Sequence, residues 1–500
     1  MSQRTDVLIV GAGPNGLAAA CELRRLGVGV RIVDADAEPH KGTRAIQLWP
    51  PTDDVLRETG VFDEAQRRGR RMPTLTYHLP GGRELNIALG ARNEPLLLPQ
   101  DQTVELLEAS LERHGVRVER STRVVGVSAA ADGVSVKTQT ADGPEVVSAD
   151  WLIGADGAYS TVRGQLGIDF PGKPVPTTFL LAEGDVDGEL KRNVVHYFLG
   201  RTGPVVFAPM PDGTARLSAA VTPDTPLTEE TVQRLLDERG PGGLTVRRLR
   251  HITTFGADER IAAELRQGRC FLVGDAAHTH SPLGGQGLNL GLQDVRNLSW
   301  KLAGVIHGRL RPEILDTYEP ERRAAAEQIV RTTHQLIKMF MLGPAAARVR
   351  NTAWRSLDAT GALRRWFVPL MAGWRVSYPG PLWGTAPART GLDALRARLL
   401  PAPGTRTPHW APEPDPAADR FRLLTLGPVG GELPRRAREL AERRPGHLVH
   451  EHAARRVAGG GFLLLRPDGY IAVNGVSPAE LVQVADLLDA LTAPEEAPLP

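Results

Sequence analysis

The stretch from Gly274 to Asp294, GDAAHTHSPLGGQGLNLGLQD, constrains the fold of this chain more than any other segment. It follows a short apolar run, residues 270–273, which is typical of a buried strand. Gly274 ends that strand, and Asp275 follows at once. Ligands of open α/β sheets bind at the carboxyl ends of the strands, so we expect the Asp275 carboxylate to accept hydrogen bonds from a ribose or ribityl hydroxyl.

The second half of this stretch predicts a glycine-rich loop followed by a helix. Gly284, Gly285 and Gly287 allow the backbone to lie against a flat ligand, because no Cβ atom stands between the two. From Gly287 onward, apolar residues recur at helical spacing on one face. They are Leu288, Leu292, Val295 and Leu298. The free N–H groups of the first helical turn would favour an anionic or electron-rich edge of the ligand.

A second glycine-rich motif, GAGPNG, lies near the N-terminus within a βαβ pattern. Gly11 makes the tight turn, Gly13 lets the backbone approach a pyrophosphate, and Gly16 lets helix and strand pack closely. Asp34 closes the next strand and can accept a hydrogen bond from an adenosine ribose, which suits FAD or NAD and disfavours a 2′-phosphate. The predicted elements are a strand over residues 6–10, a helix up to residue 26 and a strand over residues 28–33.

Length and composition limit the class of protein. Five hundred residues exceed one ordinary core, so two or three domains are expected. The formal net charge of +2 argues against a nucleic-acid-binding surface. Cys21 and Cys270 lack metal or CxxC spacing and are expected to be core thiols in a reducing cytoplasm. The sequence has no signal-like or membrane-spanning run, which favours a soluble cytoplasmic protein.

The Gly274–Asp294 stretch resembles the Gly-Asp motif of FAD-dependent aromatic hydroxylases, the class A flavoprotein monooxygenases typified by para-hydroxybenzoate and phenol hydroxylases. A third motif, DWLIGADGAYSTVR over residues 150–163, resembles the Asp-Gly motif of that family. Residues 315–323, LDTYEPERR, match the family as well. Further matching positions are Asp294, Asn297, Leu298, Trp300 and Lys301.

The resemblance implies a role for each matching residue. Arg44 would lie along the FAD diphosphate and hold the flavin in its mobile positions, and the carbonyl of Pro282 would lie near the substrate hydroxyl; these two are the candidate catalytic residues. Gln100 would touch the flavin, although the Arg that the family commonly has two residues later is Gln102 here. The implied cofactor-binding residues are Gly11, Gly13, Gly16, Asp34, Arg44, Gln100, Asp156, Gly157, Arg163, Gly274, Asp275, Pro282, Gly285, Gly287, Leu288 and Asn289.

The same resemblance, with the strand-rich middle of the chain, implies an α/β fold class. It consists of a Rossmann-like FAD-binding domain with an inserted β-sheet substrate domain and a C-terminal thioredoxin-like domain, which lacks cysteine and is therefore structural. The FAD-binding domain is expected to have two parts, residues 1–169 and 268–341, and a hairpin near 75–89 in the first part is expected to belong to the substrate layer. The substrate domain is expected over residues 170–267. A helical or irregular connector is expected over 342–416, and the C-terminal domain over 417–500.

Several local expectations follow. Residues 116–118 are predicted to form a strand, and residues 343–390 an irregular lid or interface. From residue 421 we expect a strand, two amphipathic helices and then a hairpin over 462–473. The candidate groups for lining the substrate pocket are His196, Tyr197, Phe198, Phe207 and Pro209; strand alternation places His196 and Phe198 on one face and Tyr197 on the other, so not all can line it.

The implied function is a monooxygenase that binds FAD noncovalently and consumes NADPH or NADH and dioxygen. It would hydroxylate an aromatic substrate, such as a polycyclic phenol or polyketide, through a flavin C4a-hydroperoxide. The alternatives are Baeyer–Villiger oxygenation, a flavin-dependent dehydrogenase or reductase without oxygen insertion, and a degenerate flavoprotein that only binds a partner. No metal site is expected, and His278 and His280 are interpreted as loop hydrogen-bonding groups. A homodimer is possible, and neither nucleic acid nor membrane is an expected partner.

Overall fold

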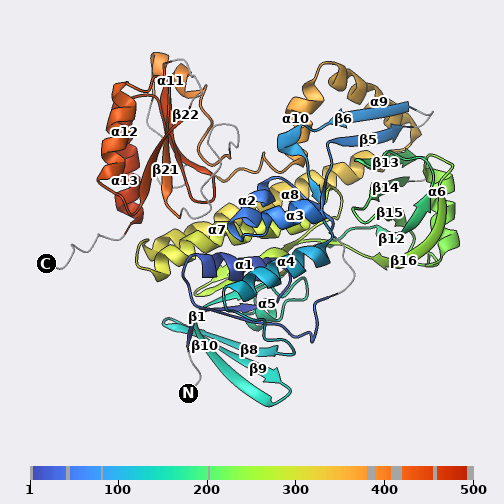
Figure 1. Cartoon of the computed structure of the whole chain (residues 1–500), viewed down its shortest axis with the longest axis horizontal. Helices are drawn as coiled ribbons and strands as arrows, with labels where there is room; N and C mark the ends of the chain where they lie inside the picture. The colour runs from blue at the N-terminus through green and yellow to red at the C-terminus, as the bar shows by residue number, and fades with distance from the viewer. Residues whose placement is uncertain are drawn as a thin grey trace.

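The structure is a computed structural model that describes residues 4–40, 45–79, 83–200, 203–379, 389–406, 419–453 and 459–492. In these ranges the chain forms two seven-stranded sheets, a four-stranded sheet and two small sheets, with helices packed against them. Two long helices, α7 (Gly287–Ile306) and α8 (Tyr318–Phe340), run through the middle of the molecule (Figure 1). The mixed α/β class predicted from the sequence is confirmed.

The central sheet brings the three sequence motifs to one edge. Its strands follow the order β18-β19-β10-β1-β2, and β19, β10, β1 and β2 are parallel. Each motif directly follows one of the adjacent strands β1, β10 and β19, so all three begin at the same carboxyl edge. The bounds are β1 Thr5–Val10, β2 Val30–Val33, β8 Arg123–Ala130, β9 Gly133–Thr140, β10 Gly143–Gly154, β18 Arg266–Gln267 and β19 Cys270–Leu272.

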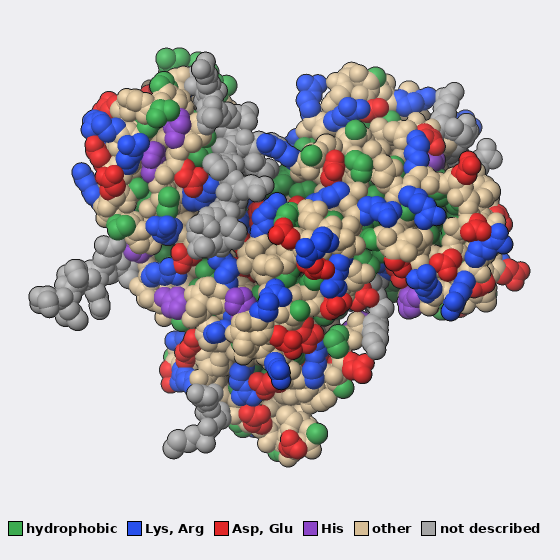
Figure 2. Space-filling view, in the orientation of Figure 1, with side chains coloured by type: hydrophobic (Ala, Val, Ile, Leu, Met, Phe, Trp, Pro, Cys, Tyr) green, Lys and Arg blue, Asp and Glu red, His purple; other side chains and the backbone are tan. Residues whose placement is uncertain are grey.

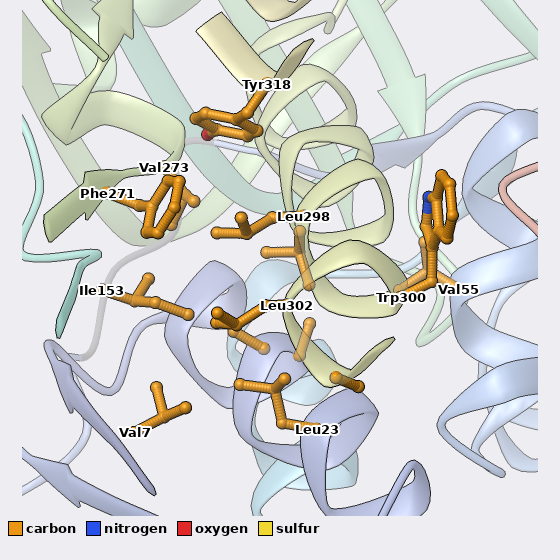
Figure 3. Packing of buried hydrophobic residues seen from close by; sticks show 14 of the residues in the cluster. Val7, Leu23, Val55, Ile153, Phe271, Val273, Leu298, Trp300, Leu302 and Tyr318 are labelled. Atoms are coloured by element: carbon orange, nitrogen blue, oxygen red, sulfur yellow. The ribbon is translucent and has the colours of Figure 1, made fainter. Parts of the chain in front are cut away.

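The largest core lies between this sheet and the helices α1 (Pro14–Arg25) and α7. Figure 3 shows Leu298 and Leu302 of α7 pointing towards the strand residues Ile153 and Val7, whereas Trp300 lies on the opposite side of the helix. The spacing of four residues between the two leucines gives α7 the apolar face that the sequence predicted. α7 therefore uses one face for the sheet and leaves the other for a different partner.

The second large sheet follows the order β16-β12-β15-β14-β13-β5-β6. Helix α6 (Glu229–Arg239) covers one of its faces through Val232, Leu235 and Leu236. The predicted hairpin forms, and its first strand pairs in parallel with β13; the turn residues 80–82 are outside the described residues. The bounds are β5 Thr74–Leu79, β6 Arg83–Ala88, β12 Thr178–Asp187, β13 Val194–Gly200, β14 Gly203–Pro209, β15 Ala215–Val221 and β16 Thr245–Phe255.

The expectation of an irregular segment over residues 343–390 is wrong for its first part, which forms α9 (Pro344–Ala359) and α10 (Ala362–Met371). Gly361, in the left-handed region at φ 69°, separates the two helices, and Pro369 falls inside α10. Trp354 packs with its ring centroid 5.1 Å from that of Tyr77, so these helices close the end of the second sheet. A separating glycine and a late proline made two short helices look irregular in the sequence.

The C-terminal sheet follows the order β22-β21-β23-β24 (Figure 1). Two expectations need correction here. A strand of polar appearance, β22, lies between α12 and the hairpin, and the second helix, α13, follows the hairpin instead of preceding it. Sequence patterning missed β22 because its alternating His and Glu residues lie at the edge of the sheet, where only its two ends are buried. The bounds are β21 Phe421–Leu426, α12 Glu432–Glu442, β22 Leu448–Ala453, β23 Gly461–Leu465, β24 Ile471–Gly475 and α13 Val482–Leu491.

The remaining elements connect these sheets. Residues 116–118 do not form the predicted strand; only Glu119 makes an isolated bridge to Val33. The connecting helices are α2 Pro51–Glu58, α3 Phe62–Arg68, α4 Gln100–Arg113, α5 Thr161–Gln165 and α11 Gly391–Ala397. The short strands are β3 Gln47–Leu48, β4 Arg70–Arg71, β7 Leu96–Leu97, β11 Gly172–Pro174, β17 Asp258–Ile261 and β20 His278–Thr279, and the 3-10 turns are η1 Ala91–Asn93, η2 Gly274–Ala276, η3 Pro312–Thr317 and η4 Pro478–Leu481.

Charges of both signs are interspersed on the face shown in Figure 2. The near balance of 60 Lys and Arg against 58 Asp and Glu agrees with that view. Among the described residues, no helix combines the length and the apolar character that crossing a bilayer requires.

We predict that neither cysteine reacts with a thiol reagent in the native protein. Cys21 and Cys270 are buried, and burial raises the pKa of Cys21 to about 12 and that of Cys270 to about 11, so almost no thiolate exists at pH 8. A colorimetric thiol assay should detect almost no reaction before denaturant is added and two thiols afterwards. Rapid native-state labelling of either residue would contradict the buried placement.

Candidate active site

The GAGPNG turn contains two glycines that the fold itself requires. Gly11 has φ +100°, and a Cβ atom there would lie 2.5 Å from the carbonyl oxygen of Ala155. A Cβ atom on Gly16 would overlap the carbonyl oxygen of Gly11. Gly13 differs from both, because a Cβ atom there would meet no atom of the described residues within 4 Å. The space beside Gly13, at the N-terminus of α1, is therefore left open by the part of the chain that the structure describes.

Asp34 fastens this turn to the end of β2. Its Oδ2 atom accepts a hydrogen bond from the N–H of Ala12 at 2.5 Å, and Oδ1 accepts one from the N–H of Asp36 at 2.9 Å. Each carboxylate oxygen has a further lone pair, so these bonds leave room for a ligand hydroxyl. Asp34 thus stabilises the turn, in addition to any hydrogen bond that it makes to a ligand.

The Asp-Gly motif makes a set of hydrogen bonds that the sequence did not predict. The Asp156 carboxylate accepts hydrogen bonds from the Ser160 hydroxyl at 2.5 Å and the Val162 N–H at 3.0 Å, so it stabilises the start of α5. The Arg163 guanidinium donates to the carbonyl oxygens of Ala158 at 2.8 Å and Ala276 at 2.9 Å. Arg163 therefore connects this motif to the Gly274–Ala276 turn. Gly157, next to Asp156, has φ +79°, a backbone conformation that favours glycine.

The Gly274–Ala276 turn is held from within the protein and presents Asp275 at the surface. The N–H of Gly274 donates to Oδ2 of Asp294 at 2.9 Å. Asn15 of the GAGPNG motif occupies the space that a side chain on Gly274 or Gly291 would need. The GAGPNG motif and the Gly274–Asp294 stretch are thus in direct contact, which favours glycine at both of those positions.

The GGQG loop is fixed by Asn289, which uses all of its hydrogen-bonding capacity inside the protein. Its side-chain oxygen accepts from the Trp49 N–H at 2.6 Å and the Thr52 hydroxyl at 2.8 Å. Its side-chain amide donates to the carbonyl oxygens of Gln47 at 2.8 Å and Gly285 at 2.7 Å. The side chain of Asn289 is therefore a clamp between this loop and residues 47–52, and only its backbone remains for a cofactor.

A cavity of about 1040 Å³, counted out to its open mouth, lies between the GGQG loop and the second large sheet. Its wall is mostly apolar. Of the five candidate lining groups, only Tyr197 borders it; His196, Phe198 and Phe207 pack on the opposite face of the sheet, and Pro209 does not line it either. The lining residues are Ala45, Ile46, Gln47, Leu97, Thr177, Phe179, Leu181, Val195, Tyr197, Pro204, Val206, Ala208, Arg216, Ser218, Ala219, Ala220, Phe255, Pro282, Leu283, Gly284, Gly285, Ile337 and Met341.

Two buried polar groups interrupt this apolar wall from opposite sides. Gln47 is 8% exposed, and its Nε2 atom has no hydrogen-bond partner among the described residues. Arg216, on β15, is 4% exposed and lies 3.6 Å from the Glu183 carboxylate. Sequence patterning predicted neither, because one polar residue in a strand is usually exposed.

The other predicted residues are placed as follows. Pro282 borders the cavity, and its carbonyl oxygen accepts from the Gly285 N–H at 3.1 Å. Gln100 is the first residue of α4 and is partly exposed, as is Gln102. Leu288 is buried in the main core, and Gly287 begins α7. Arg44 lies outside the described residues.

His278 and His280 make hydrogen bonds, as the sequence predicted, one to a side chain of α7 and one within the loop. Nε2 of His278 lies 2.7 Å from Oδ2 of Asp294, and Nδ1 of His280 lies 2.8 Å from the Ser281 carbonyl oxygen. Burial lowers the pKa of His280 to about 4, so this ring is neutral near pH 7. Within the described ranges, no group of three or more His, Cys, Asp or Glu side chains is arranged to hold a metal ion.

These residues fit a dinucleotide cofactor. The unclaimed space at Gly13 lies at a helix N-terminus, where a diphosphate is favoured. Asp275, whose side chain is exposed, follows β19 at the same edge of the central sheet.

Comparison with known proteins identifies the cofactor. Residues 4–333 match the family described as "FAD binding domain". The chain belongs to this family. It is 32% identical to 6-methylpretetramide 4-monooxygenase of Streptomyces rimosus, over 98% of this chain and 94% of that protein. The chain is an FAD-dependent monooxygenase, and NADPH or NADH is the usual co-substrate of the class.

Solved structures agree with this assignment. The anhydrotetracycline hydroxylase OxyS from Streptomyces rimosus aligns with a TM-score of 0.77 and 30% identity, over 98% of this chain and all of that one. A ternary complex of aklavinone-11 hydroxylase with FAD and aklavinone aligns with a TM-score of 0.75 and 25% identity, over 98% of this chain and 99% of that one.

The contrast between Gly13 and Gly16 gives a test of the FAD site. We expect Gly13→Val to leave the apoprotein folded, with a cost of at most about 1 kcal/mol at a helix N-cap, while FAD binding is lost because the side chain fills the open space. Gly16→Ala should instead lower the melting temperature of the apoprotein, because its Cβ overlaps backbone. Differential scanning fluorimetry and FAD titration separate the two effects. Normal FAD affinity in Gly13→Val would refute this placement.

Proposed function

We propose that this enzyme hydroxylates a polycyclic phenol of the aromatic polyketide type, in the biosynthesis of a natural product. The cavity beside the GGQG loop is the observation that supports this most strongly. Ligand sites are typically concave and lined mostly by apolar side chains with a few polar groups, and this cavity has such a lining, which suits a flat, fused-ring phenol. The names of the relatives refer to 6-methylpretetramide, anhydrotetracycline and aklavinone, which supports a substrate of the fused-ring type.

The domain assignment follows the sheets. We assign the central sheet to a Rossmann-like FAD-binding domain formed by residues 1–169 and 268–341, and the second large sheet to a substrate domain over 170–267 that also receives the hairpin near 75–89. Residues 342–416 would be a connector, and residues 417–500 a thioredoxin-like domain. In support, the second sheet carries most of the cavity wall, and the C-terminal part forms a four-stranded sheet of its own, β22-β21-β23-β24.

For the cofactor, we assign the diphosphate to the N-terminus of α1 at Gly13, the adenosine ribose to Asp34, the ribityl chain to Asp275 and the flavin ring to the side of Gly285 and the start of α7. Bound noncovalently there, FAD would supply the activation of dioxygen with electrons from NADPH or NADH. The protein's part is to orient the substrate and to exclude water with the apolar cavity wall.

The polar groups of the cavity would orient the substrate. Arg216 and the amide of Gln47 would bind oxygen substituents of the fused rings, because a buried cation and a buried donor favour carbonyl or phenolate oxygens. The Pro282 carbonyl oxygen retains a second lone pair beside its bond from Gly285, so it could accept a hydrogen bond from the substrate hydroxyl. That bond would draw electron density towards the ring carbon that is oxidised.

Product analysis tests the reaction. The enzyme is incubated with NAD(P)H, ¹⁸O-labelled dioxygen and a panel of polycyclic phenols and quinones, and the products are examined by mass spectrometry. We expect one ¹⁸O atom in a ring-intact phenolic product. A lactone carrying the label would instead indicate Baeyer–Villiger oxygenation, and an oxidised product without label would indicate dehydrogenation; either result overturns the proposal.

The role of Arg216 can be tested separately. Arg216→Met should raise the KM for an oxygenated polycyclic substrate about 10- to 100-fold, because a charge-assisted hydrogen bond contributes about 1.5–3 kcal/mol. The affinity for FAD should stay unchanged. Ser218→Ala is the matched control, since Ser218 borders the cavity two residues further along the same strand. Equal KM values for the wild type and Arg216→Met would contradict this role.

A further inference from the structure

A buried network of ion pairs connects the C-terminal sheet to the two central helices. It contains three carboxylates and three cations, so it is electrically balanced, and all six side chains are almost inaccessible to solvent. Its members are Asp294 and Lys301 on α7, Glu321 and Arg322 on α8, and Arg466 and Asp468 in the turn between β23 and β24.

Arg466 is the contribution of the C-terminal sheet to this network. Its guanidinium donates to both carboxylate oxygens of Glu321, at 2.7 and 2.9 Å, and is paired with Asp468 in its own turn. Lys301 donates to the same Glu321 carboxylate at 2.8 Å. Burial alone would raise the pKa of Glu321, but Arg466 and Lys301 outweigh it and hold the pKa at about 2, so this carboxylate stays ionised.

The other end of the network reaches the turn that carries Asp275. Arg322, the next residue after Glu321 on α8, donates from Nε to Oδ1 of Asp294 at 2.6 Å. The second oxygen of Asp294 accepts the N–H of Gly274 at 2.9 Å and contacts His278 at 2.7 Å. One helix segment, Glu321–Arg322, therefore binds the C-terminal sheet on one side and the cofactor turn on the other.

Tyrosine and amide groups reinforce the link between the two ends. The Tyr378 hydroxyl accepts from Arg322 at 3.1 Å and from Asn297 at 3.0 Å, so it joins both halves of the network. The Tyr378 ring stacks on Tyr470 of the C-terminal sheet, with centroids 3.9 Å apart. Trp300, on the face of α7 away from the central sheet, meets Phe421 of β21 at 5.7 Å.

We propose that Arg466 is a positioning residue for FAD: by binding Glu321 it fixes the α8 segment that orients Asp294, and hence the Gly274–Asp275 turn. This inference rests on the proposed cofactor placement. It gives the C-terminal sheet a role in cofactor retention, although none of the described residues of that sheet borders the cavity.

The physical reason is the balance of buried charge. Removal of Arg466 takes away the cation that pairs with both Glu321 and Asp468 and leaves these two buried carboxylates undercompensated, and breaking a buried pair in this way is strongly unfavourable. The carboxylates must then move towards solvent or capture a proton, and either change displaces the α8 segment that ends at Arg322. The Asp294 carboxylate, which depends on Arg322, loses its fixed orientation towards Gly274.

The test compares Arg466→Met with Arg422→Met. Arg422 is also buried in the C-terminal sheet and also pairs with a glutamate, Glu451 at 2.6 Å, but it lies on β21 and this glutamate belongs to the same sheet, whereas Arg466 pairs with α8. The readouts are the dissociation constant of FAD from the full-length apoprotein, hydrogen exchange of residues 270–280 and the melting temperature. They distinguish positioning of the turn from loss of stability in the C-terminal sheet.

We expect Arg466→Met to weaken FAD binding about tenfold, a typical coupling between distant sites, and to speed exchange in residues 270–280. Arg422→Met should change neither, even where it lowers the melting temperature. Arg466→Lys, which keeps the charge, should restore part of the affinity and serves as the second variant if Arg466→Met does not fold.

The proposal is overturned if FAD binds Arg466→Met and wild type equally, or if Arg422→Met weakens FAD binding as much as Arg466→Met does. It is also overturned if exchange in residues 270–280 does not respond to either Arg466 variant. Failure of the cofactor placement itself gives a different pattern, in which Gly13→Val retains FAD.

Discussion

The rest of the site depends on the hydrogen bonds and the ion pair that the buried carboxylate of Asp294 makes. It accepts a backbone N–H from Gly274, an imidazole from His278 and a guanidinium from Arg322, and it is fully buried. Burial alone would raise its pKa, but His278 and Arg322 outweigh that effect and keep the pKa below the usual range. An ionised carboxylate in this position joins the strand end, the first turns of α7 and helix α8 at one point, so the three cannot move independently.

The parts of the site that the sequence predicted are those determined by local sterics. Gly11 and Gly16 are required because a Cβ atom would collide with neighbouring backbone, and such a requirement shows in the sequence as fixed spacing. The helix from Gly287 was predictable for a similar reason, since its apolar residues recur at helical spacing. Strand periodicity also predicted correctly that Tyr197 faces away from His196 and Phe198, but it could not say which face borders the cavity.

The parts that could not be predicted depend on contacts between distant residues. Arg466 and Glu321 are 145 positions apart, and nothing in either local sequence identifies the partner. Arg163 looked like a cofactor ligand, yet it donates to two backbone carbonyl groups, because its position relative to the Gly274 turn is set by the pairing of β10 with β19. The helices over residues 344–371 were missed because Gly361 and Pro369 interrupt the helical pattern, while packing against Tyr77 and Phe340 places both helices.

The GGQG loop contributes to the cavity wall and is also held in place by hydrogen bonds to other parts of the chain. Its glycines, Gly284 and Gly285, border the cavity, while Gln286 donates to the Met371 carbonyl oxygen at 2.7 Å and Asn289 clamps residues 47–52. The opposite wall comes from strands whose other face packs on α6 and does not touch the three motifs. Substitutions on those strands can therefore change the shape and polarity of the cavity without disturbing the Asp294 network. The proposed substrate wall and the proposed cofactor turns thus belong to different sheets, so the shape of the cavity can change while the turns stay the same.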